Sequence, residues 1–229
     1  MARRIPENRF DELVRGATEV FIARGFRQTQ MSDIADAVGV AKGTLYGYVE
    51  SKDALLLLCL RHADEPGAIP VPDDLPLAAP GPGSMGSLVK ARLAEGNASP
   101  RLDAALGLDR ASDPKAELAD VIGEFYDLIS ENRHRIKLLD RCMDHPELGD
   151  LWQKAGRERS RQQFVRYLES RIRAGQVREV PDIRLAARFI IETCSTWAVH
   201  IHWDRAPEAY AASAMRANAI DFLVRGLLP

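Results

Sequence analysis

The chain has 229 residues and a mass of 25.4 kDa, with 46% hydrophobic and 28% charged residues. These fractions are typical of a globular protein and exclude a chain that is disordered throughout. Lys and Arg number 31 against 33 Asp and Glu, a net charge of −2, so the overall charge points neither to nucleic acid nor to an acidic membrane surface.

The sequence predicts a cytoplasmic protein with no membrane association. No apolar run reaches the length of about 18 residues that a membrane span requires, and no apolar stretch follows the N-terminal arginines as it would in a signal peptide. The three cysteines, Cys59, Cys142 and Cys194, are odd in number and far apart. They therefore predict a reducing compartment rather than a disulfide framework.

Four helices are predicted in the first 65 residues. Apolar residues at helical spacing over 10–21 form one stripe, which Gly25 ends. A two-turn pattern follows over 31–38, and a third short segment starts near Ala41. The fourth helix begins at Ser51, a residue suited to an N-cap, and continues through a leucine-rich stretch.

The second and third segments have the proportions of a helix-turn-helix, with a tight turn at Gly39 between two short helices. In that motif the second helix enters the major groove of DNA, since only the major groove is wide enough to admit a helix. Helices this short are not stable alone. The first and fourth helices would supply the scaffold.

A composition change follows at Pro66. Six prolines and four glycines lie in 66–86, so we expect a linker there. The stretch 81–86 matches the dinucleotide pattern G-x-G-x-x-G, but that fingerprint requires a preceding strand, and the match is interpreted as coincidence. The predicted domains are a DNA-binding domain at 1–65, the linker at 66–86, and a second domain at 87–229, to which a family resemblance given below assigns effector binding and dimerisation.

Beyond the linker the apolar pattern is again helical. Spans are predicted over 87–95, 101–108, 115–130 and 133–144, followed by helices after Pro146, Pro181 and Pro207. The predicted fold class is therefore all-α, with an N-terminal helix-turn-helix domain and a larger C-terminal helical domain.

The first 55 residues or so also carry a family signature with every spacing kept. It reads Gly25-Phe26, Thr29, Ile34-Ala35, Gly39-Val40, Lys42-Gly43-Thr44-Leu45-Tyr46, Tyr48 and Ser51-Lys52-Asp53. This pattern resembles the N-terminal signature of TetR-family transcriptional regulators. The resemblance implies a homodimer that binds a palindromic operator and responds to a small molecule.

Three positions depart from that signature. Ala41 replaces a Ser, which removes a hydroxyl that can cap the third helix. Gly47 replaces a His or Tyr that could reach DNA, and as a glycine it costs about 1 kcal/mol in a helix relative to Ala. Val49 replaces a Phe and reduces a core contact.

The predicted DNA contacts lie on and around the third helix. Lys42 and Thr44 occupy its first turn, and by the resemblance Tyr48 donates its hydroxyl to a phosphate while Leu45 faces inward. Amides at helix N-termini favour anions, and an N-terminal arginine can enter a minor groove. The full predicted set is Arg4, Thr29, Gln30, Lys42, Gly43, Thr44, Tyr46, Tyr48 and Lys52. Alternatively, Thr29 is only a helix cap and the tyrosines belong partly to the core.

The two most C-terminal helices are predicted to form the dimer interface. The helix after Pro181 is apolar on two faces, and a helix of that kind must bury both. By the resemblance, these helices pair with their copies in a four-helix bundle. The interface residues predicted are Ala187, Ile191, Cys194, Ala198, Ala214, Ala217 and Phe222. The alternative is that both faces belong to a monomer core.

An effector pocket is predicted among the middle helices. Aromatic and soft side chains there form the candidate lining, namely Phe125, Tyr126, Ile129, Met143, Trp152, Phe164 and Trp197. Residues at such spacing also serve as ordinary core, which is the competing interpretation.

No catalytic constellation is present in the sequence, and we expect neither an enzyme nor a cofactor or metal site. The motifs G-x-S-x-G and H-E-x-x-H are absent, and no cysteine pair has zinc-ligand spacing. The predicted function is a ligand-responsive repressor that leaves a palindromic operator when a small molecule binds. One alternative is a DNA-binding dimer whose C-terminal domain serves dimerisation or recruitment; another is a helical enzyme or carrier with a vestigial DNA-binding head.

Overall fold

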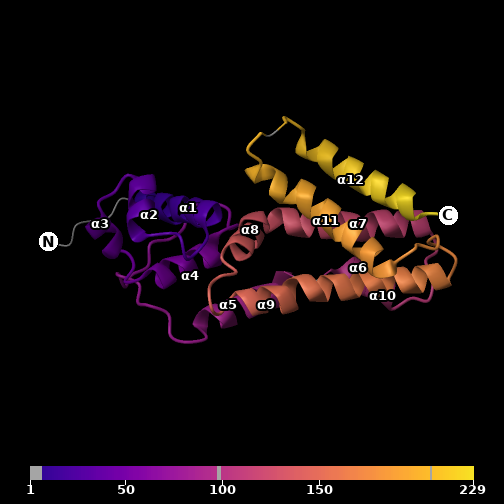
Figure 1. The fold of residues 1–229 in the computed structure, drawn as a ribbon, viewed down its shortest axis with the longest axis horizontal. Helices are drawn as coiled ribbons and strands as arrows, with labels where there is room; N and C mark the ends of the chain where they lie inside the picture. The colour runs from indigo at the N-terminus through magenta and orange to yellow at the C-terminus, as the bar shows by residue number, and fades with distance from the viewer. Residues whose placement is uncertain (1–6, 97–98, 207) are drawn as a thin grey trace. The chain divides into compact units, whose positions relative to one another are not determined.

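The computed structural model describes residues 7–96, 99–206 and 208–229, and within these the chain forms helices joined by loops, with no strand (Figure 1). This confirms the predicted all-α class. The chain divides into two compact units. The first comprises Met1–Arg92 and His134–Gln153, and the second comprises Leu93–Arg133 and Lys154–Pro229. None of the described helices is both long and apolar enough to cross a membrane.

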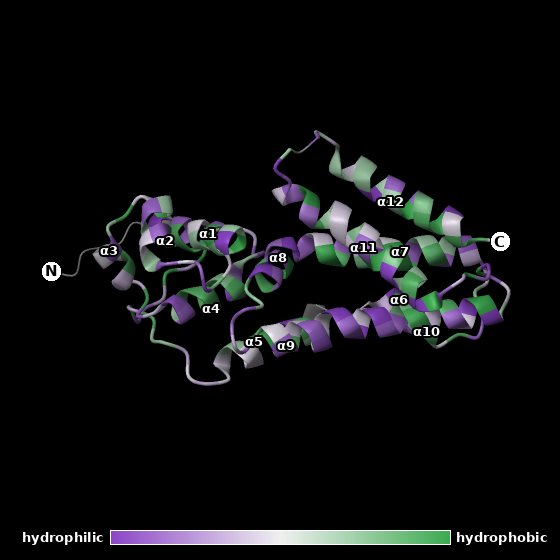
Figure 2. Cartoon of the chain, in the orientation of Figure 1, coloured by the Kyte–Doolittle hydropathy of each residue, from purple (hydrophilic) through white to green (hydrophobic). Residues whose placement is uncertain are grey.

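The first unit is built on four helices at the N-terminal end of the chain. They are α1 (Glu7–Arg24), α2 (Met31–Val38), α3 (Lys42–Tyr46) and α4 (Lys52–His62). Helix α1 packs against α2 and α4, and α2 packs against α3. Helix α4 is apolar along most of its length (Figure 2), and its side chains complete a core with others from α1 to α3, including Phe10, Leu13, Phe21, Ile34, Leu45, Leu55 and Leu56.

Two helix ends in this unit are set by single residues, as the sequence predicted. Gly39 ends α2 with a φ of 71°, and its N–H bonds to the carbonyls of Ala35 and Asp36. A left-handed conformation of this kind favours glycine because it has no Cβ. At the start of α4, the Ser51 hydroxyl oxygen accepts a hydrogen bond from the Ala54 N–H at 3.0 Å. Gly39 thus forms the turn between the two helices of the helix-turn-helix, and Ser51 caps the start of the scaffold helix α4.

The first unit also includes segments that lie far along the chain. It holds most of α5 (Ser84–Gly96) and α8 (Arg133–Arg141), together with the short α9 (Gly149–Leu151). Residues 66–83 contain no helix, and they belong to this unit as well. The domain limits predicted from the sequence stay predictions, but the contacts group the proline-rich stretch with the helix-turn-helix.

The second unit consists of packed helices. They are α6 (Pro100–Leu106), α7 (Pro114–Glu131), α10 (Arg159–Arg173), α11 (Ile183–Ala198) and α12 (Ala212–Leu227). Helix α7 packs against α6, α11 and α12, and α10 packs against α6 and α11. The sequence predicted one long helix after Pro146. The structure instead has the short α9 and the longer α10, with a π-helical stretch, η1 (Trp152–Glu158), between them.

A buried ion pair joins three helices of the second unit. Arg171 on α10 is only 1% exposed, and its Nε lies 2.6 Å from a carboxylate oxygen of Glu117 on α7. The same guanidinium donates to the carbonyls of Ala105 and Leu108, and the Tyr167 hydroxyl donates to Glu117. The hydrogen bonds that Arg171 donates to Glu117 raise the pKa of Arg171 above its usual range. The charge is therefore fully partnered, as a buried charge must be.

All three thiols are buried and unpaired. Burial raises the pKa of Cys59, Cys142 and Cys194 to about 12 in each case. Because the thiolate is the reactive form, we expect no alkylation by iodoacetamide at pH 8 in the folded protein and complete alkylation in urea. Mass spectrometry counts the adducts, and rapid labelling of any thiol in the folded protein would contradict its burial.

Candidate DNA-binding site

Helix α3 presents one face to solvent and one to the core. Lys42, Gly43, Thr44 and Tyr46 are exposed, whereas Leu45 is fully buried. No side-chain hydrogen bond caps the helix at Ala41, which confirms the missing cap predicted there. A β-carbon placed on Gly43 would meet no atom within 4 Å, so this face also lets a ligand approach the backbone closely.

Tyr48 lies just after α3 with its ring in the core. The residue is 4% exposed, and its ring packs against Phe10 with 6.0 Å between centroids. Its hydroxyl bonds to no residue that the structure describes, and no buried side-chain oxygen in this part of the chain lacks a partner. The predicted bond from its hydroxyl to a phosphate stays a prediction, and the burial of the ring agrees with the alternative that Tyr48 belongs partly to the core.

The remaining predicted DNA contacts fall into different settings. Gln30 is exposed at the N-cap of α2, where its N–H donates to Asp33. Thr29 needs a correction, because its side chain is buried and its hydroxyl donates to the Gly25 carbonyl at 2.6 Å. It serves the turn between α1 and α2 and has no exposed side chain to offer DNA. Arg4 lies outside the described residues.

Lys52 is also occupied inside the unit. Its ammonium donates to the carbonyls of Phe26 and Thr29, at 2.7 and 2.9 Å, and lies 4.2 Å from the centre of the Phe26 ring. The cation thus ties the start of α4 to the turn before α2. A contact with a phosphate would require Lys52 to share these bonds, so its predicted role in DNA binding stays a prediction.

Residues 134–153 are hydrogen-bonded to the DNA-binding head, as we call the four helices α1 to α4, and the sequence analysis did not predict this attachment. Asp64, after α4, accepts hydrogen bonds from the His134 and Arg135 N–H groups at the start of α8, both at 2.9 Å. At the other end of α8, Arg141 donates to the Ile22 and Ala23 carbonyls, which end α1. The partners are 70 to 119 positions apart in the sequence, so no local pattern could reveal them.

The glycine-rich stretch at 81–86 binds a carboxylate of this chain. The N–H groups of Gly83 and Gly86 each donate to one oxygen of Glu147, both at 2.9 Å. These bonds hold the pKa of Glu147 below its usual range. No strand precedes the motif in the described chain, which agrees with the interpretation of the dinucleotide pattern as coincidence.

The predicted effector-pocket residues divide between the two units. In the second unit, the Phe125 and Phe164 rings meet edge to face at 5.2 Å, and the Tyr126 hydroxyl donates to the Trp197 carbonyl. Ile129 is buried in the same unit. Met143 and Trp152 belong to the first unit, where Met143 is exposed and the Trp152 indole donates to Asp140.

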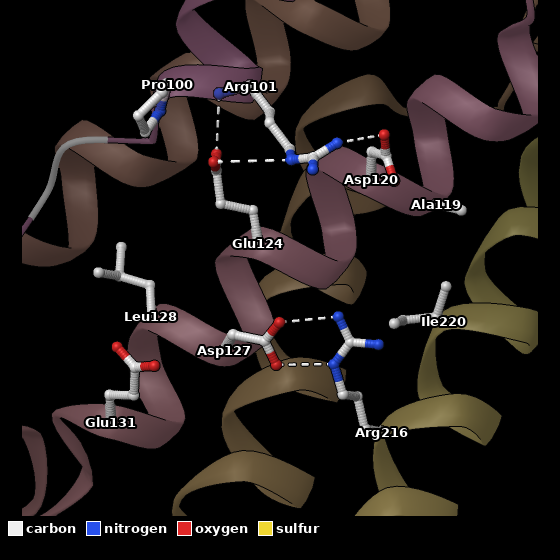
Figure 3. A pocket seen from close by; sticks show the side chains of 10 residues that line it. All are labelled: Pro100, Arg101, Ala119, Asp120, Glu124, Asp127, Leu128, Glu131, Arg216 and Ile220. Atoms are coloured by element: carbon white, nitrogen blue, oxygen red, sulfur yellow. Dashed lines mark hydrogen bonds and ion pairs between the residues drawn. The ribbon is translucent and has the colours of Figure 1, made fainter.

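A pocket of about 460 Å³ opens in the second unit, and none of those seven residues lines it (Figure 3). Its walls come from α6, α7 and α12 and are rich in charge. Arg216 pairs with both oxygens of Asp127 at 2.6 and 2.7 Å, and Arg101 pairs with Asp120 and Glu124. Four carboxylates face two guanidiniums here, because Glu131 completes the acidic set. The pocket therefore suits a polar or cationic molecule and disfavours an anionic one.

The predicted dimer residues need correction at three positions. Ala187, Cys194 and Ala198 are buried within the second unit, because this face of α11 packs in the protomer. Ile191 is half-buried, while Ala214, Ala217 and Phe222 on α12 are exposed. Large exposed apolar side chains also occur on α11, at Leu185 and Phe189, four residues apart on one face.

The exposed short helix after a glycine turn, held by two longer helices, defines a helix-turn-helix DNA-binding protein of the transcription-regulator class. The family model described as "Bacterial regulatory proteins, tetR family" matches residues 13–59. A second family model, described as "AefR-like transcriptional repressor, C-terminal domain", matches residues 134–225. The chain belongs to the TetR family of transcriptional regulators, which are DNA-binding transcription factors and not enzymes.

Named relatives agree with this assignment. The fatty acid metabolism regulator protein of Bacillus subtilis is 22% identical over 227 residues, 96% of this chain and 95% of that protein. The transcriptional repressor KstR2 of Mycolicibacterium smegmatis is 39% identical over 56 residues, 24% of this chain and 27% of that one. The transcriptional activator FasR of the same species is 43% identical over 63 residues, 27% and 29% of the two chains.

Solved structures share the fold across nearly the whole chain. The ketosteroid transcriptional regulator KstR2 of Mycobacterium tuberculosis matches with a TM-score of 0.58 and 20% identity, covering 99% of this chain and 97% of that one. The TetR-family regulator PfmR of Thermus thermophilus matches with a TM-score of 0.53 and 22% identity, covering 96% and 100%. Members of the family bind DNA operators and are typically dimers.

Proposed function

We propose that this regulator is a homodimeric repressor that leaves a palindromic operator when a small molecule binds its C-terminal domain, residues 87–229. The observation that carries the proposal is the exposed face of α3, where Lys42, Thr44 and Tyr46 stand on a helix whose inward residue, Leu45, is buried. In a helix-turn-helix this face enters the major groove. Gln30, Gly43 and the Tyr48 hydroxyl extend the proposed contact surface.

Two-fold symmetry follows from the proposed interface. Exposed apolar residues of these helices include Leu185 and Phe189 on α11 and Ala214, Ala217 and Phe222 on α12. Their burial against a second copy would remove apolar surface from water. A symmetric dimer presents two α3 helices, and these suit half-sites spaced by whole turns of DNA.

The effector class to test first is apolar and comes from lipid metabolism. Support comes from the Bacillus subtilis relative, which matches 96% of this chain and is named a fatty acid metabolism regulator. The buried Phe125 and Phe164 rings, which meet edge to face, give the interior of the second unit an apolar region that an apolar effector would contact. The acidic pocket at Arg216 is a poor match for a fatty acid because its carboxylates repel an anion.

Residues 134–153 are proposed to carry the signal to the head. They are continuous in sequence with α7 on one side and α10 on the other. Within them, Arg141 donates a hydrogen bond to the end of α1, and the Arg135 N–H donates to Asp64, just after α4. A ligand that binds one arrangement of this segment more tightly would shift the balance between two head positions. The competing function is a DNA-binding dimer whose C-terminal domain recruits a partner without sensing a ligand.

The proposal is tested by selecting bound duplexes from a random-sequence pool and repeating the selection with long-chain fatty acids. We expect a palindromic consensus that is lost when an effective fatty acid is added. A consensus that no added molecule disturbs would favour the recruitment function. Failure to enrich any sequence would contradict DNA binding by this chain.

The Lys42→Ala substitution tests the contact surface directly. We expect weaker binding to every duplex, with the slope of log affinity against log salt reduced by about one, because one phosphate contact is lost. Fluorescence anisotropy across a salt series measures this slope. Lys115→Ala, an exposed lysine at the start of α7, is the matched control and should leave the slope unchanged. Equal slopes in both variants would remove Lys42 from the interface.

A further inference from the structure

Residues 66–83 have the composition of a flexible connection, yet one of them is bonded to the chain just after α3. The Leu77 N–H donates to the Tyr48 carbonyl at 2.8 Å, and the Glu50 N–H donates to the Leu77 carbonyl at 2.9 Å. Val49, between these two, is fully buried and forms a parallel bridge with Leu77. The turn that follows α3 is thus held on both sides by a single residue of the loop.

Further contacts anchor the same loop at other points of the first unit. Arg15 on α1 donates to the Gly67 carbonyl at 2.6 Å, and the Ile69 N–H donates to Asp11, also on α1, at 3.2 Å. The side chain of Ile69 is buried. Beyond Leu77, the Ala79 N–H donates to the Glu50 carboxylate at 3.1 Å. A flexible linker needs no such contacts. This loop connects the scaffold helix α1 with the turn at 48–50.

We propose that Leu77 and Glu50 are positioning residues for DNA recognition, and that residues 66–83 act as a strut that fixes the orientation of α3. This inference rests on the proposed contact of α3 with DNA. It extends the helix-turn-helix to include a loop that the domain limits predicted from the sequence had left outside.

The shortness of α3 gives the physical reason. The helix has five residues, no side-chain cap at its start, and Gly47 at its end. A helix this short gains little stability from its own hydrogen bonds, and glycine adds backbone freedom. The orientation of Lys42, Thr44 and Tyr46 therefore depends on what holds the chain at both ends. At the C-terminal end, the strut bonds to Tyr48, two residues after the helix.

Two variants of Glu50 isolate one contact of the strut. Glu50→Gln keeps a side-chain oxygen that can accept from the Ala79 N–H, whereas Glu50→Ala removes it. Both lose the same negative charge, so electrostatic effects on DNA binding cancel between them. We expect Glu50→Ala to bind the selected duplex about threefold more weakly than Glu50→Gln, in keeping with the loss of one hydrogen bond.

A second pair addresses the backbone bridge. Leu77→Pro removes the N–H that donates to the Tyr48 carbonyl, whereas Leu77→Ala keeps it. We expect Leu77→Pro to bind at least about tenfold more weakly than Leu77→Ala, since a hydrogen bond is lost and a carbonyl is left without its donor. If Leu77→Pro does not fold, the Glu50 pair alone decides.

Two measurements complete the test. Anisotropy with a duplex selected by the wild-type protein reports affinity per folded molecule, and hydrogen exchange of residues 41–49 without DNA reports the order of α3. Weaker binding by the disrupted member of each pair, with faster exchange in 41–49 and an unchanged unfolding temperature, supports the strut. Equal affinity and equal exchange within both pairs overturn it, as does a loss of affinity that disappears after correction for the folded fraction.

If the wild-type protein itself selects no duplex, the proposed function fails, and the exchange measurement alone decides whether the strut orders α3.

Discussion

Replacing Phe189 and Phe222 by Asp is expected to convert the protein from a dimer to a monomer and to weaken its binding to a palindromic duplex by about a hundredfold or more. Phe189 is 63% and Phe222 is 73% exposed in the protomer. Burying such a side chain contributes about 1.5–3 kcal/mol each, and a charge at the centre of an apolar interface reverses that gain. The loss on DNA follows because two linked half-site contacts gain about 10²–10⁴ in affinity over one.

The protomer itself should remain stable in that variant, because both side chains lie in solvent before the dimer forms. Sedimentation gives the mass, which should fall to the 25.4 kDa of one chain. Leu108→Asp is the matched control, since Leu108 is also an exposed apolar residue of the second unit but lies outside α11 and α12. A double variant that stays dimeric would place the interface on another face of the protein.

Replacing Arg171 by Met is expected to destabilise the protein by about 3–5 kcal/mol, because it leaves the Glu117 carboxylate, only 16% exposed, without its cationic partner. The Ala105 and Leu108 carbonyls lose their donor at the same time. For a chain of this size the thermal midpoint should fall by about 6–20 °C. Circular dichroism during heating measures the midpoint.

Two further variants distinguish loss of the ion pair from loss of packing. Arg173→Met changes an exposed arginine of the same helix and should leave the midpoint nearly unchanged. The double variant Arg171→Met with Glu117→Met removes both charges and should recover much of the loss, because apolar residues often replace a buried pair at little cost. If Arg171→Met alone were as stable as the wild-type protein, the pair would contribute nothing to the fold.

The local features of the head were predictable from the sequence because their causes are local. Gly39 ends α2 through its left-handed backbone, Ser51 caps α4, and Leu45 is buried as the family resemblance implied. The family signature depends on the same short-range pattern, so the fold class and the helix-turn-helix were both predicted correctly. The absence of a capping hydroxyl at Ala41 was equally visible.

Features that depend on contacts between distant segments could not be predicted in this way. Thr29 was placed on DNA, but its hydroxyl bonds to Gly25 inside the head. On α11, periodicity identified two apolar faces but could not say which face the protomer buries. Ala187 and Cys194 were therefore predicted at the dimer interface, whereas the protomer itself buries them. A helix carries no sign of which neighbour covers which face until the neighbours are in place.

By itself, then, the sequence determined the all-α class, the turns of the DNA-binding head and the exposed α3 that marks the family, since each depends on residues a few positions apart. Only the tertiary structure decided that residues 66–83 and 134–153 join the head, and that Arg171 and Glu117 meet in the interior. The physical reason is the range of the interactions. Capping and helical periodicity act within one or two turns, whereas the bonds of Leu77, Arg141 and Arg171 form only once the fold brings their partners together.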